Sequence, residues 1–379
     1  MIIGVPKEVK VQEYRIGMVP GGVKSLIRAG HRVLLEKAAG EGSGYHDGEY
    51  EAAGAKMVTS ASEVYERADM IVKVKEPQPS EYKMLKHGQI LFCYLHLAPE
   101  PELTQALIDQ GVNAIALETI QLDDGTLPCL SPMSEIAGRM AVQIGAHYLE
   151  KKNGGAGVLL GGVPGVTPAL VTIIGAGQVG SNAARIAVGM NARVVIFDID
   201  LQKLAHLDEL YAGRLITSMS DPDQIERFVP YSHLLVGGVL HPGGRAPVLV
   251  TEEMVKEMRK GSVIVDVAVD QGGCIETIHP TTHENPTYIL HDVIHYGVSN
   301  MPGAVPRTST QALTNATLRY IQMITDKGLE HALENYPPLA RGLNIYCPSK
   351  ESKGCITCEP VAQALGLEYS AYSSLVHNI

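Results

Sequence analysis

The stretch Val171-Thr-Ile-Ile-Gly175-Ala-Gly177-Gln-Val-Gly180 decides the fold of this 379-residue chain. Its first four residues are β-branched and predict a buried strand, and the alanine-rich segment that follows predicts a helix. Gly175 permits a tight turn between the strand and the helix. Gly177 has no Cβ atom, so a ligand could approach the backbone closely there, and Gly180 lets the helix pack closely on the strand. We therefore expect a strand, a glycine turn and a helix in direct succession.

A second predicted strand, from Ala192 to Asp198, ends in a carboxylate. The glycine spacing alone is a weak indication, but strand, turn, helix and acid together are typical of a Rossmann-type dinucleotide site. A pyrophosphate would meet the free N–H groups at the helix N-terminus. Asp198 would bind the ribose hydroxyls and repel a 2′-phosphate, which predicts NAD rather than NADP, although Lys203 would soften that discrimination. The alternative is a glycine turn without a ligand.

Short apolar runs alternate with helical segments on both sides of this unit, which predicts parallel sheets with crossover helices. We expect strands at 1–5, 32–36, 70–75, 89–95, 113–118, 170–174, 193–197, 232–236 and 262–268. Two longer helices are expected, at 134–152 and from 307 to about 328, each about 30 Å long at 1.5 Å per residue.

The predicted fold class is therefore α/β, with two doubly wound Rossmann-like domains joined by two long helices. A discontinuous substrate domain would comprise residues 1–128 and 307–379, and the NAD-binding domain would comprise residues 129–306. On this topology the C-terminal segment returns to the first domain.

Composition narrows the class of ligand. The formal net charge of −10 argues against nucleic acid as a partner, because phosphate binding needs a cationic face. An uncharged stretch at 153–184 is long enough to span a bilayer, but it contains nine glycines and two prolines and reads as loop, strand and loop. We expect a small-molecule partner and no membrane.

Six cysteines are scattered along the chain, without the density of a secreted disulfide scaffold. This usage predicts a cytoplasmic location. Cys355 and Cys358 have the spacing of half a zinc site, and Cys347 is close in sequence, but no second pair completes four ligands. We predict ordinary thiols and no metal.

Polar residues occur at the ends of three apolar strands, at positions that suit catalysis. Lys73 and Lys75 lie in one predicted strand, His96 follows the next, and Asp270 follows a strand of the second domain. The carboxyl ends of parallel strands line the ligand crevice, so Lys75 and His96 are candidates for anion binding and acid/base chemistry. Considered alone, each residue also has a non-functional interpretation: Lys75 as a solvated lysine, His96 as a structural histidine and Asp270 as an aspartate that begins a turn.

Several motifs, in order, resemble the alanine dehydrogenase and transhydrogenase family over the chain to about residue 345. The motifs are Pro6-Lys-Glu, Glu13-Tyr-Arg15-Ile-Gly, Val72-Lys-Val-Lys-Glu-Pro77, Tyr94-Leu-His96-Leu, Ala268-Val-Asp270-Gln-Gly-Gly and Asn300-Met-Pro-Gly-Ala-Val-Pro306-Arg-Thr-Ser-Thr. The resemblance to alanine dehydrogenases implies reversible oxidative deamination of L-alanine with NAD⁺ and water to pyruvate, ammonium and NADH, by a homohexamer.

The resemblance also implies roles for single residues. Arg15 and Lys75 would hold the substrate carboxylate and carbonyl oxygen, Asn300 would position the substrate, and Met133 would line the methyl pocket. His96 would be the general acid/base through an iminium and a carbinolamine, and Asp270 would direct the water and ammonia steps. Histidine exchanges protons near neutral pH and arginine can bind a carboxylate through two hydrogen bonds, so the residue types fit.

The expected dinucleotide contacts combine the glycine turn with positions that the resemblance implies. They are Ser134, Gly175, Gly177, Gln178, Val179, Gly180, Asp198, Lys203, Ser220, Val239, Leu240, Val267, Ala268, Val269, Asp270, His279, Val298, Ser299, Asn300 and Met301. Some relatives carry a metal-binding pair late in the second long helix. Met323 and Lys327 occupy the matching positions here, so the resemblance also implies no metal.

Three rival functions stay open at this point. A soluble nucleotide-binding subunit of a proton-translocating transhydrogenase shares the expected fold, although Lys75 and His96 favour the dehydrogenase. A saccharopine or opine type dehydrogenase would need a wider pocket, and a non-catalytic NAD-binding protein would need neither residue. Because the acid/base and the dinucleotide are expected on different domains, we expect closure about a hinge at the two long helices.

Overall fold

The computed structural model describes residues 1–239, 246–349 and 351–376. The chain forms two compact units: unit 1 is Met1–Met133 with Val305–Ile379, and unit 2 is Ser134–Ala304. The sequence analysis places the two boundaries at 128/129 and 306/307. Each unit is a parallel-dominated sheet with helices, so the predicted fold class of two doubly wound α/β units is confirmed.

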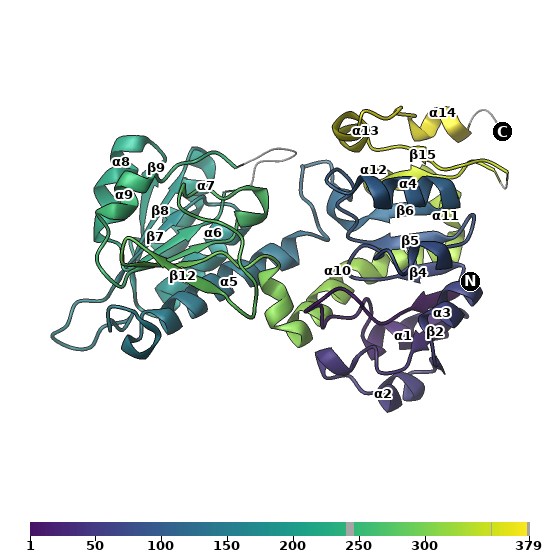
Figure 1. The fold of residues 1–379 in the computed structure, drawn as a ribbon, viewed down its shortest axis with the longest axis horizontal. Coiled ribbons are helices and arrows are strands. Elements are labelled where there is room, and N and C mark those ends of the chain that lie inside the picture. Colours follow the sequence, from purple (N-terminus) through teal and green to yellow (C-terminus); the bar gives the residue numbers. More distant parts are fainter. Residues whose placement is uncertain (240–245, 350, 377–379) are drawn as a thin grey trace. The chain divides into compact units, whose positions relative to one another are not determined.

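The sheet of unit 1 has the order β15-β14-β6-β5-β4-β1-β2-β3. Its first six strands along the chain are parallel, whereas β14 runs antiparallel to β6 and β15 antiparallel to β14. The end of the chain therefore completes the sheet begun by the N-terminus (Figure 1). The bounds are β1 Ile2–Val5, β2 Arg32–Glu36, β3 Lys56–Val58, β4 Met70–Val72, β5 Ile90–Cys93, β6 Asn113–Ala116, β14 Leu343–Tyr346 and β15 Cys355–Ile356.

Helices cover this sheet and enclose an aliphatic core in which Leu91, Leu103 and Leu107 are fully buried. Several helices begin with proline in the first turn, where the missing N–H costs nothing. The bounds are α1 Pro20–Arg28, α2 Asp47–Ala52, α3 Ala61–Arg67, α4 Pro101–Gln110, α10 Pro306–Lys327, α11 Leu329–Asn335, α12 Pro337–Gly342, α13 Glu359–Leu365 and α14 Tyr372–Val376.

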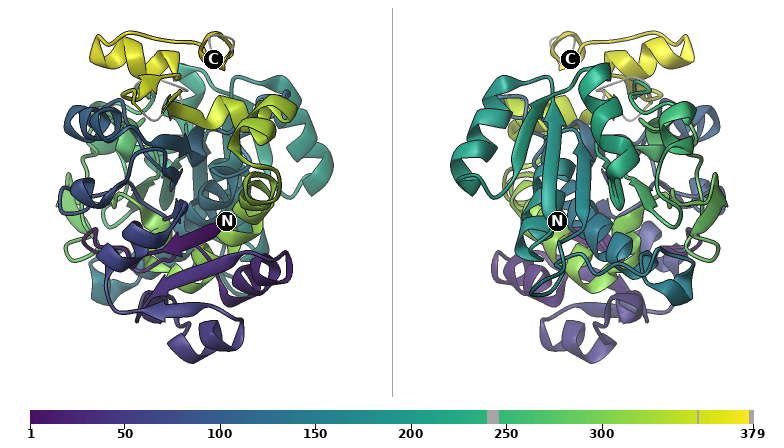
Figure 2. Two further views of the ribbon diagram at one scale, coloured as in Figure 1. Left: turned by 90° about the vertical axis from the view of Figure 1, so that its right-hand side faces the viewer. Right: turned by 90° about the vertical axis from the view of Figure 1, so that its left-hand side faces the viewer.

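The sheet of unit 2 has the order β12-β13-β11-β10-β7-β8-β9, and only its edge strand β12 is antiparallel. Figure 2 shows helices on both sides of these strands, as a doubly wound sheet requires. The strands are β7 Leu170–Ile174, β8 Arg193–Asp198, β9 Ile216–Met219, β10 Leu234–Gly237, β11 Val263–Asp266, β12 Thr287–Leu290 and β13 Val293–Tyr296. The helices are α5 Ser131–Tyr148, α6 Gln178–Gly189, α7 Leu201–Tyr211, α8 Pro222–Phe228 and α9 Glu252–Lys256.

Several predicted elements have different ends in the structure. The strand expected at 70–75 ends at Val72, although Tyr94 still donates its N–H to the carbonyl of Val74, 3.0 Å away. The helix expected at 134–152 begins three residues earlier, at Ser131, and ends at Tyr148 before a separate 3₁₀ turn at Lys151–Asn153.

Within the described ranges, no helix is both long and apolar enough to cross a lipid bilayer.

Candidate active site

The predicted substrate residues of unit 1 follow strands that are neighbours in the sheet. Arg15 lies in the loop after β1, Lys75 follows β4, and His96 follows β5, while β4 pairs with both β1 and β5. Glu118 follows β6, the next strand along. Because all four strands are parallel, their carboxyl ends meet at one edge, and the topology brings these residues to that edge.

Arg15 is held by a carboxylate that the sequence analysis missed. Its Nε donates to Oε1 of Glu13 over 2.7 Å, and its Nη2 donates to Oε2 over 2.5 Å. The two side chains are 2% and 1% exposed, so this ion pair is desolvated. Burial acts to raise the pKa of Glu13, but the hydrogen bonds and charge of Arg15 outweigh it and lower the pKa overall.

Arg15 also reaches a second predicted substrate residue. Its Nη1 lies 3.2 Å from Sδ of Met133, in the first turn of α5. Tyr94, in the loop after β5, donates its hydroxyl to the carbonyl of Cys129 over 2.6 Å and ties that loop to the segment before α5. The guanidinium expected to bind a carboxylate and the thioether expected to line a methyl pocket are therefore in contact.

The structure separates the two lysines of the Val-Lys-Val-Lys motif. Lys73 is fully buried and pairs with Glu8 at 3.2 Å and Glu81 at 3.0 Å, so it serves the interior of unit 1. Lys75 is half-buried and makes no hydrogen bond or ion pair with any residue that the structure describes. Burial, and then the nearby charge of Arg15, lower the pKa of Lys75. Lys75 is the lysine available to a ligand.

His96 occupies a strained backbone conformation that a carboxylate supports. Its φ of +48° is in the left-handed region that non-glycine residues rarely adopt. Glu118 accepts the backbone N–H of His96 over 2.6 Å and that of Leu95 over 3.1 Å, and its Oε1 lies 3.8 Å from Nδ1 of His96. The imidazole lies nearly parallel to the Tyr94 ring, with centroids 6.1 Å apart, and its side chain is 45% exposed, so a substrate can reach it.

The glycine turn of unit 2 has the geometry that a dinucleotide needs. Gly175 has a φ of +99°, and a Cβ on Gly180 would lie 1.7 Å from the carbonyl oxygen of Gly175, so the helix packs directly on the turn. A Cβ on Gly177 would meet nothing within 4 Å, which leaves open space at the start of α6. No side chain caps α6, so its first N–H groups can bind an anion. These features fit a pyrophosphate.

Asp198 ends β8, and it also shapes the turn. Its Oδ2 accepts the N–H of Ala176 over 2.6 Å, and its Oδ1 accepts that of Asp200 over 2.8 Å. Ser220, after β9, donates its N–H to the carbonyl of Asp198 over 3.0 Å. Nζ of Lys203 lies 3.6 Å from Oδ2 of Asp200. This ion pair holds the positive charge of Lys203 near the end of β8, where Asp198 lies.

A third unpredicted carboxylate, Asp266, organises the loop after β11 that holds the predicted positions Val267, Ala268, Val269 and Asp270. It is fully buried and accepts the N–H groups of Ala268 and Cys274, each over 2.8 Å. Burial raises the pKa of Asp266. Asp270 is exposed on the 3₁₀ turn Val269–Gln271 that this loop forms.

Several of the remaining predicted contacts also follow strands of unit 2. Val239 follows β10, and the segment Val298, Ser299, Asn300 and Met301 follows β13, with Asn300 at a φ of +58°. Leu240 lies outside the described residues. His279 stacks on Tyr288 with ring centroids 3.8 Å apart. Gly138, one turn beyond Ser134 on α5, is so close to α6 that a Cβ would lie 2.1 Å from the carbonyl of Val179.

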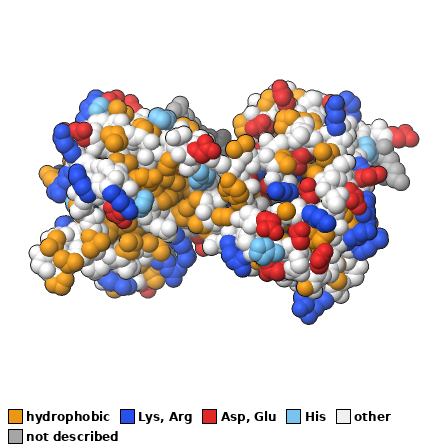
Figure 3. Space-filling model, turned by 60° about the horizontal axis from the view of Figure 1, so that its bottom comes forward, with side chains coloured by type: hydrophobic (Ala, Val, Ile, Leu, Met, Phe, Trp, Pro, Cys, Tyr) orange, Lys and Arg blue, Asp and Glu red, His pale blue; other side chains and the backbone are white. Residues whose placement is uncertain are grey.

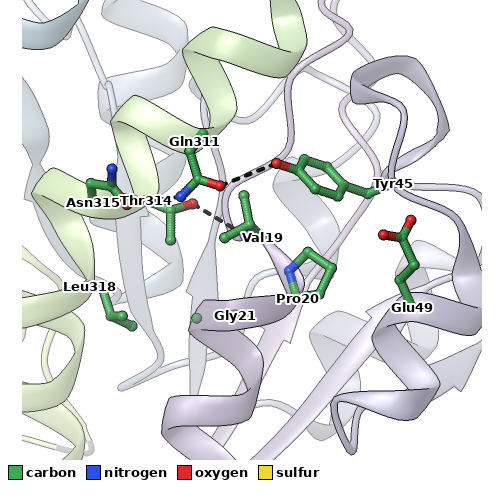
Figure 4. Close-up of a pocket in the computed structure, with 10 residues that line it drawn as sticks. Val19, Pro20, Gly21, Tyr45, Glu49, Gln311, Thr314, Asn315 and Leu318 are labelled. Atoms are coloured by element: carbon green, nitrogen blue, oxygen red, sulfur yellow. Dashed lines mark hydrogen bonds between the residues drawn. The ribbon is translucent and has the colours of Figure 1, made fainter.

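A separate pocket of about 320 Å³ lies in unit 1 beside the start of α1 and one side of α10 (Figure 4). None of the predicted site residues that the structure describes lines it. Its polar groups already bind one another or the backbone: Tyr45 donates to Gln311 over 3.3 Å, and Thr314 accepts the N–H of Val19 over 3.2 Å. We assign it no part in the site.

The comparisons with known proteins agree with this geometry. The family model for the alanine dehydrogenase/PNT N-terminal domain matches residues 4–137, and the model for the alanine dehydrogenase/PNT C-terminal domain matches residues 141–350. The chain belongs to the alanine dehydrogenase/PNT family. The resemblance found in the sequence motifs is thereby confirmed.

Relatives in this family match the chain from end to end. The alanine dehydrogenase of Methanococcus maripaludis is 56% identical over 371 residues, which cover 98% of each chain. Alanine dehydrogenase 2 of Staphylococcus aureus is 53% identical over 378 residues, which cover 100% of each chain. The chain is therefore an enzyme of the pyridine-nucleotide-dependent oxidoreductase class, and the alternative of a non-catalytic binding protein is excluded.

Two solved structures have folds similar to that of this chain. An L-alanine dehydrogenase matches with a TM-score of 0.92 and 51% identity, over 97% of this chain and 99% of that one. A transhydrogenase from Sinorhizobium meliloti matches with a TM-score of 0.81 at 23% identity, over 92% of this chain and 99% of that one, and shows the shared fold alone. Among the described residues of the present family member, no three His, Cys, Asp or Glu side chains gather as metal ligands would.

Proposed function

We propose that this chain is an NAD-dependent alanine dehydrogenase, which catalyses the reversible oxidative deamination of L-alanine to pyruvate and ammonium. The observation that carries the proposal is the contact between Arg15 and Met133, at the sheet edge that also holds Lys75 and His96. A cation and a thioether only 3.2 Å apart suit a carboxylate that carries a very short apolar side chain. Full-length relatives named alanine dehydrogenase support the same substrate.

Each residue of unit 1 has a chemical task in this proposal. Arg15 binds the substrate carboxylate, and Met133 limits the space for the side chain at Cα. Lys75, with its lowered pKa and without a partner among the described residues, hydrogen-bonds the oxygen that becomes the pyruvate carbonyl. His96 takes and returns the protons as water adds to the iminium and the carbinolamine then loses ammonia.

The residues of unit 2 would hold the dinucleotide and direct water. When it is bound, NAD⁺ accepts the hydride that leaves Cα of the substrate. The N–H groups at the start of α6 and the open space over Gly177 would hold the pyrophosphate. Asp198 would bind the ribose hydroxyls and repel a 2′-phosphate, and Asp270 and Asn300 would position water, ammonia and the substrate. The remaining predicted contacts keep their cofactor roles as proposals.

Hydride transfer needs Cα within ~3–3.5 Å of the nicotinamide ring. Residues of both units must therefore act on one substrate during turnover. We propose that closure about the two long helices, α5 and α10, achieves this and excludes water.

Two further proposals concern the setting of the enzyme. A homohexamer is supported by the resemblance. The turn at 163–166 offers an apolar surface for a contact between subunits, because Val163 and Val166 are 54% and 61% exposed while the N–H of Val166 is donated to the carbonyl of Val163 over 2.8 Å. On the face drawn in Figure 3, hydrophobic side chains also gather over unit 2. A cytoplasmic location is supported by the six cysteines, all of which are free thiols.

An amino-acid panel tests the substrate and the cofactor together. The purified enzyme is given glycine, L-alanine, 2-aminobutyrate, L-serine or L-glutamate with NAD⁺, and NADH is followed by absorbance. We expect L-alanine to give the highest kcat/KM, and Met133→Ala to raise the relative rate with 2-aminobutyrate. A preference for L-glutamate or another long substrate would contradict the small pocket.

A further inference from the structure

Glu13 and Arg15 form a local unit that goes beyond a single ion pair. Besides the two bonds from the guanidinium, Oε1 of Glu13 accepts the backbone N–H of Arg15 over 3.0 Å. At least three donors of one residue thus converge on one carboxylate. Gln12, between this unit and the preceding turn, has a φ of +61°, a backbone strain that the loop must offset elsewhere.

The backbone on both sides of Arg15 is fixed independently of Glu13. Ser43 donates its hydroxyl to the carbonyl of Tyr14 over 2.9 Å, and Ile16 donates its N–H to Oγ1 of Thr310 over 3.2 Å. Ser43 and Thr310 are themselves joined by a hydroxyl–hydroxyl bond of 2.8 Å. These bonds place the Cα of Arg15, but they leave the direction of its long side chain undetermined.

Glu13 determines that direction. The contact is side-on, through Nε and one N–H of Nη2, so it fixes the plane of the guanidinium and directs the Nη1 edge away from Glu13. That edge meets Sδ of Met133 at 3.2 Å. A thioether is a weak acceptor, and a carboxylate at this edge would accept a much stronger hydrogen bond than the thioether does.

We propose that Glu13 is a positioning residue for the substrate: it orients the guanidinium of Arg15 so that the Nη1 edge receives the carboxylate of a 2-amino or 2-oxo acid. This inference rests on the proposed function, in which Arg15 binds that carboxylate. A purely structural partner would need only to neutralise a buried cation, whereas the side-on contact and the third bond to the backbone also set an orientation.

The negative charge of Glu13 and its effect on the orientation of Arg15 lead to opposite predictions for the binding of a carboxylate by the Glu13→Gln variant. Arg15 and Lys75 carry two positive charges, and Glu13 cancels one of them. Glu13→Gln removes the negative charge, which by electrostatics alone would tighten the binding of a carboxylate. It also presents an amide N–H to the donors of Arg15, which turns the guanidinium away. Weaker binding in this variant therefore reports orientation rather than charge.

The experiment measures the KM for L-alanine, the KM for NAD⁺, and the inhibition constant of propionate, which has the carboxylate and methyl group but no amino group. We expect Glu13→Gln to raise both the KM for L-alanine and the inhibition constant of propionate roughly 10- to 100-fold. The KM for NAD⁺ should change less than twofold. Glu102→Gln, at an exposed position of α4, is the matched control and should change none of them.

Arg15→Lys supplies the second half of the test. Lysine cannot make the side-on pair, so adding Glu13→Gln to Arg15→Lys should change the alanine KM less than twofold further. If Glu13→Gln does not fold, Glu13→Asp withdraws the carboxylate by one methylene and should raise the same two constants by a smaller factor.

Three results would overturn the proposal: constants for Glu13→Gln that stay within twofold of the wild type, tighter propionate binding, or a full additional loss in the Arg15→Lys background. NADH formation from L-alanine by the wild-type enzyme is the separate readout of the proposed function, so a failure of that function can be distinguished from a failure of this inference.

Discussion

Glu118 accepts the backbone N–H of His96 over 2.6 Å, and its Oε1 lies 3.8 Å from Nδ1 of the same residue. One carboxylate thus supports the backbone of the predicted acid/base and faces its ring. The left-handed φ of His96, +48°, costs about 1–3 kcal/mol in an unsupported loop. This bond to Glu118 offsets that strain and keeps the imidazole at the carboxyl edge of the sheet.

Removal of this support should lower both activity and stability. Glu118→Ala is expected to reduce kcat with L-alanine more than tenfold and to lower the free energy of unfolding by about 1–3 kcal/mol. Glu118→Gln keeps an oxygen for the backbone N–H groups and should retain most of the stability. Urea unfolding and steady-state rates check this, and equal activity in the alanine variant would show that His96 needs no such support.

Alanine substitutions at two glycines of the same turn should have different effects, one on folding and the other on NAD binding. Gly180→Ala places a Cβ 1.7 Å from the carbonyl of Gly175 and should prevent unit 2 from folding stably. Gly177→Ala meets no protein atom within 4 Å, at a φ of −71° that alanine tolerates, so it should fold normally. It would nevertheless fill the space proposed for the pyrophosphate.

Circular dichroism and NAD titration separate these outcomes. We expect Gly177→Ala to keep the wild-type melting temperature within about 2 °C and to weaken NAD binding at least roughly tenfold. A folded Gly177→Ala enzyme with unchanged NAD affinity would place the pyrophosphate elsewhere.

Asp198 should set the choice between the two dinucleotides. Asp198→Gly removes the charge that repels a 2′-phosphate and also the acceptor for Ala176 and Asp200. We expect kcat/KM with NAD⁺ to fall at least roughly tenfold and the ratio of NADP⁺ to NAD⁺ use to rise by a similar factor. Asp223→Gly, on α8, is the control, and an unchanged ratio in Asp198→Gly would refute the ribose contact.

His295 should make unit 2 sensitive to acid. It is fully buried in β13 and bonds the hydroxyl of Thr277 at 2.8 Å and the carbonyl of Val293 at 3.0 Å. Burial lowers the pKa of His295 to about 4. Between a pH of about 6.5 and a pH of about 4 the unfolded chain binds a proton at this residue and the folded chain does not, so stability falls as pH falls.

The loss attributable to His295 is bounded at about 3.4 kcal/mol, and most of it develops below the pKa of the unfolded histidine. Urea midpoints measured between pH 7.5 and pH 4.5 test this expectation. His295→Asn should flatten the curve, whereas His206→Asn, on the exposed side of α7, should leave it unchanged. Parallel curves for wild type and His295→Asn would contradict the assignment.

The parts of the site that sequence could predict are those set by local spacing. The glycine turn, the end of β8 at Asp198 and the position of His96 after an apolar strand need only neighbouring residues, and the structure places each at a carboxyl end of a strand. Lys73 and Lys75 look equivalent in sequence, and only the buried partners Glu8 and Glu81 separate them.

The carboxylates that hold these residues were beyond the sequence analysis. Glu118 and Asp266 bind backbone N–H groups of loops that come close only in the folded sheet. Glu13 left a weak signal, since residues two apart on an extended segment share one side, and it stands two positions before Arg15. The strands β3, β9 and β12 to β15 were also not predicted.

The central claim is that a hydride passes from Cα of L-alanine to the nicotinamide of NAD⁺. The direct measurement supplies L-alanine that carries deuterium at Cα and examines the reduced dinucleotide by mass spectrometry, for the wild type and for His96→Ala. The account predicts deuterated NADH from the wild type and at least roughly a hundredfold less from His96→Ala. Unlabelled NADH, no NADH, or an undiminished rate in His96→Ala would contradict it.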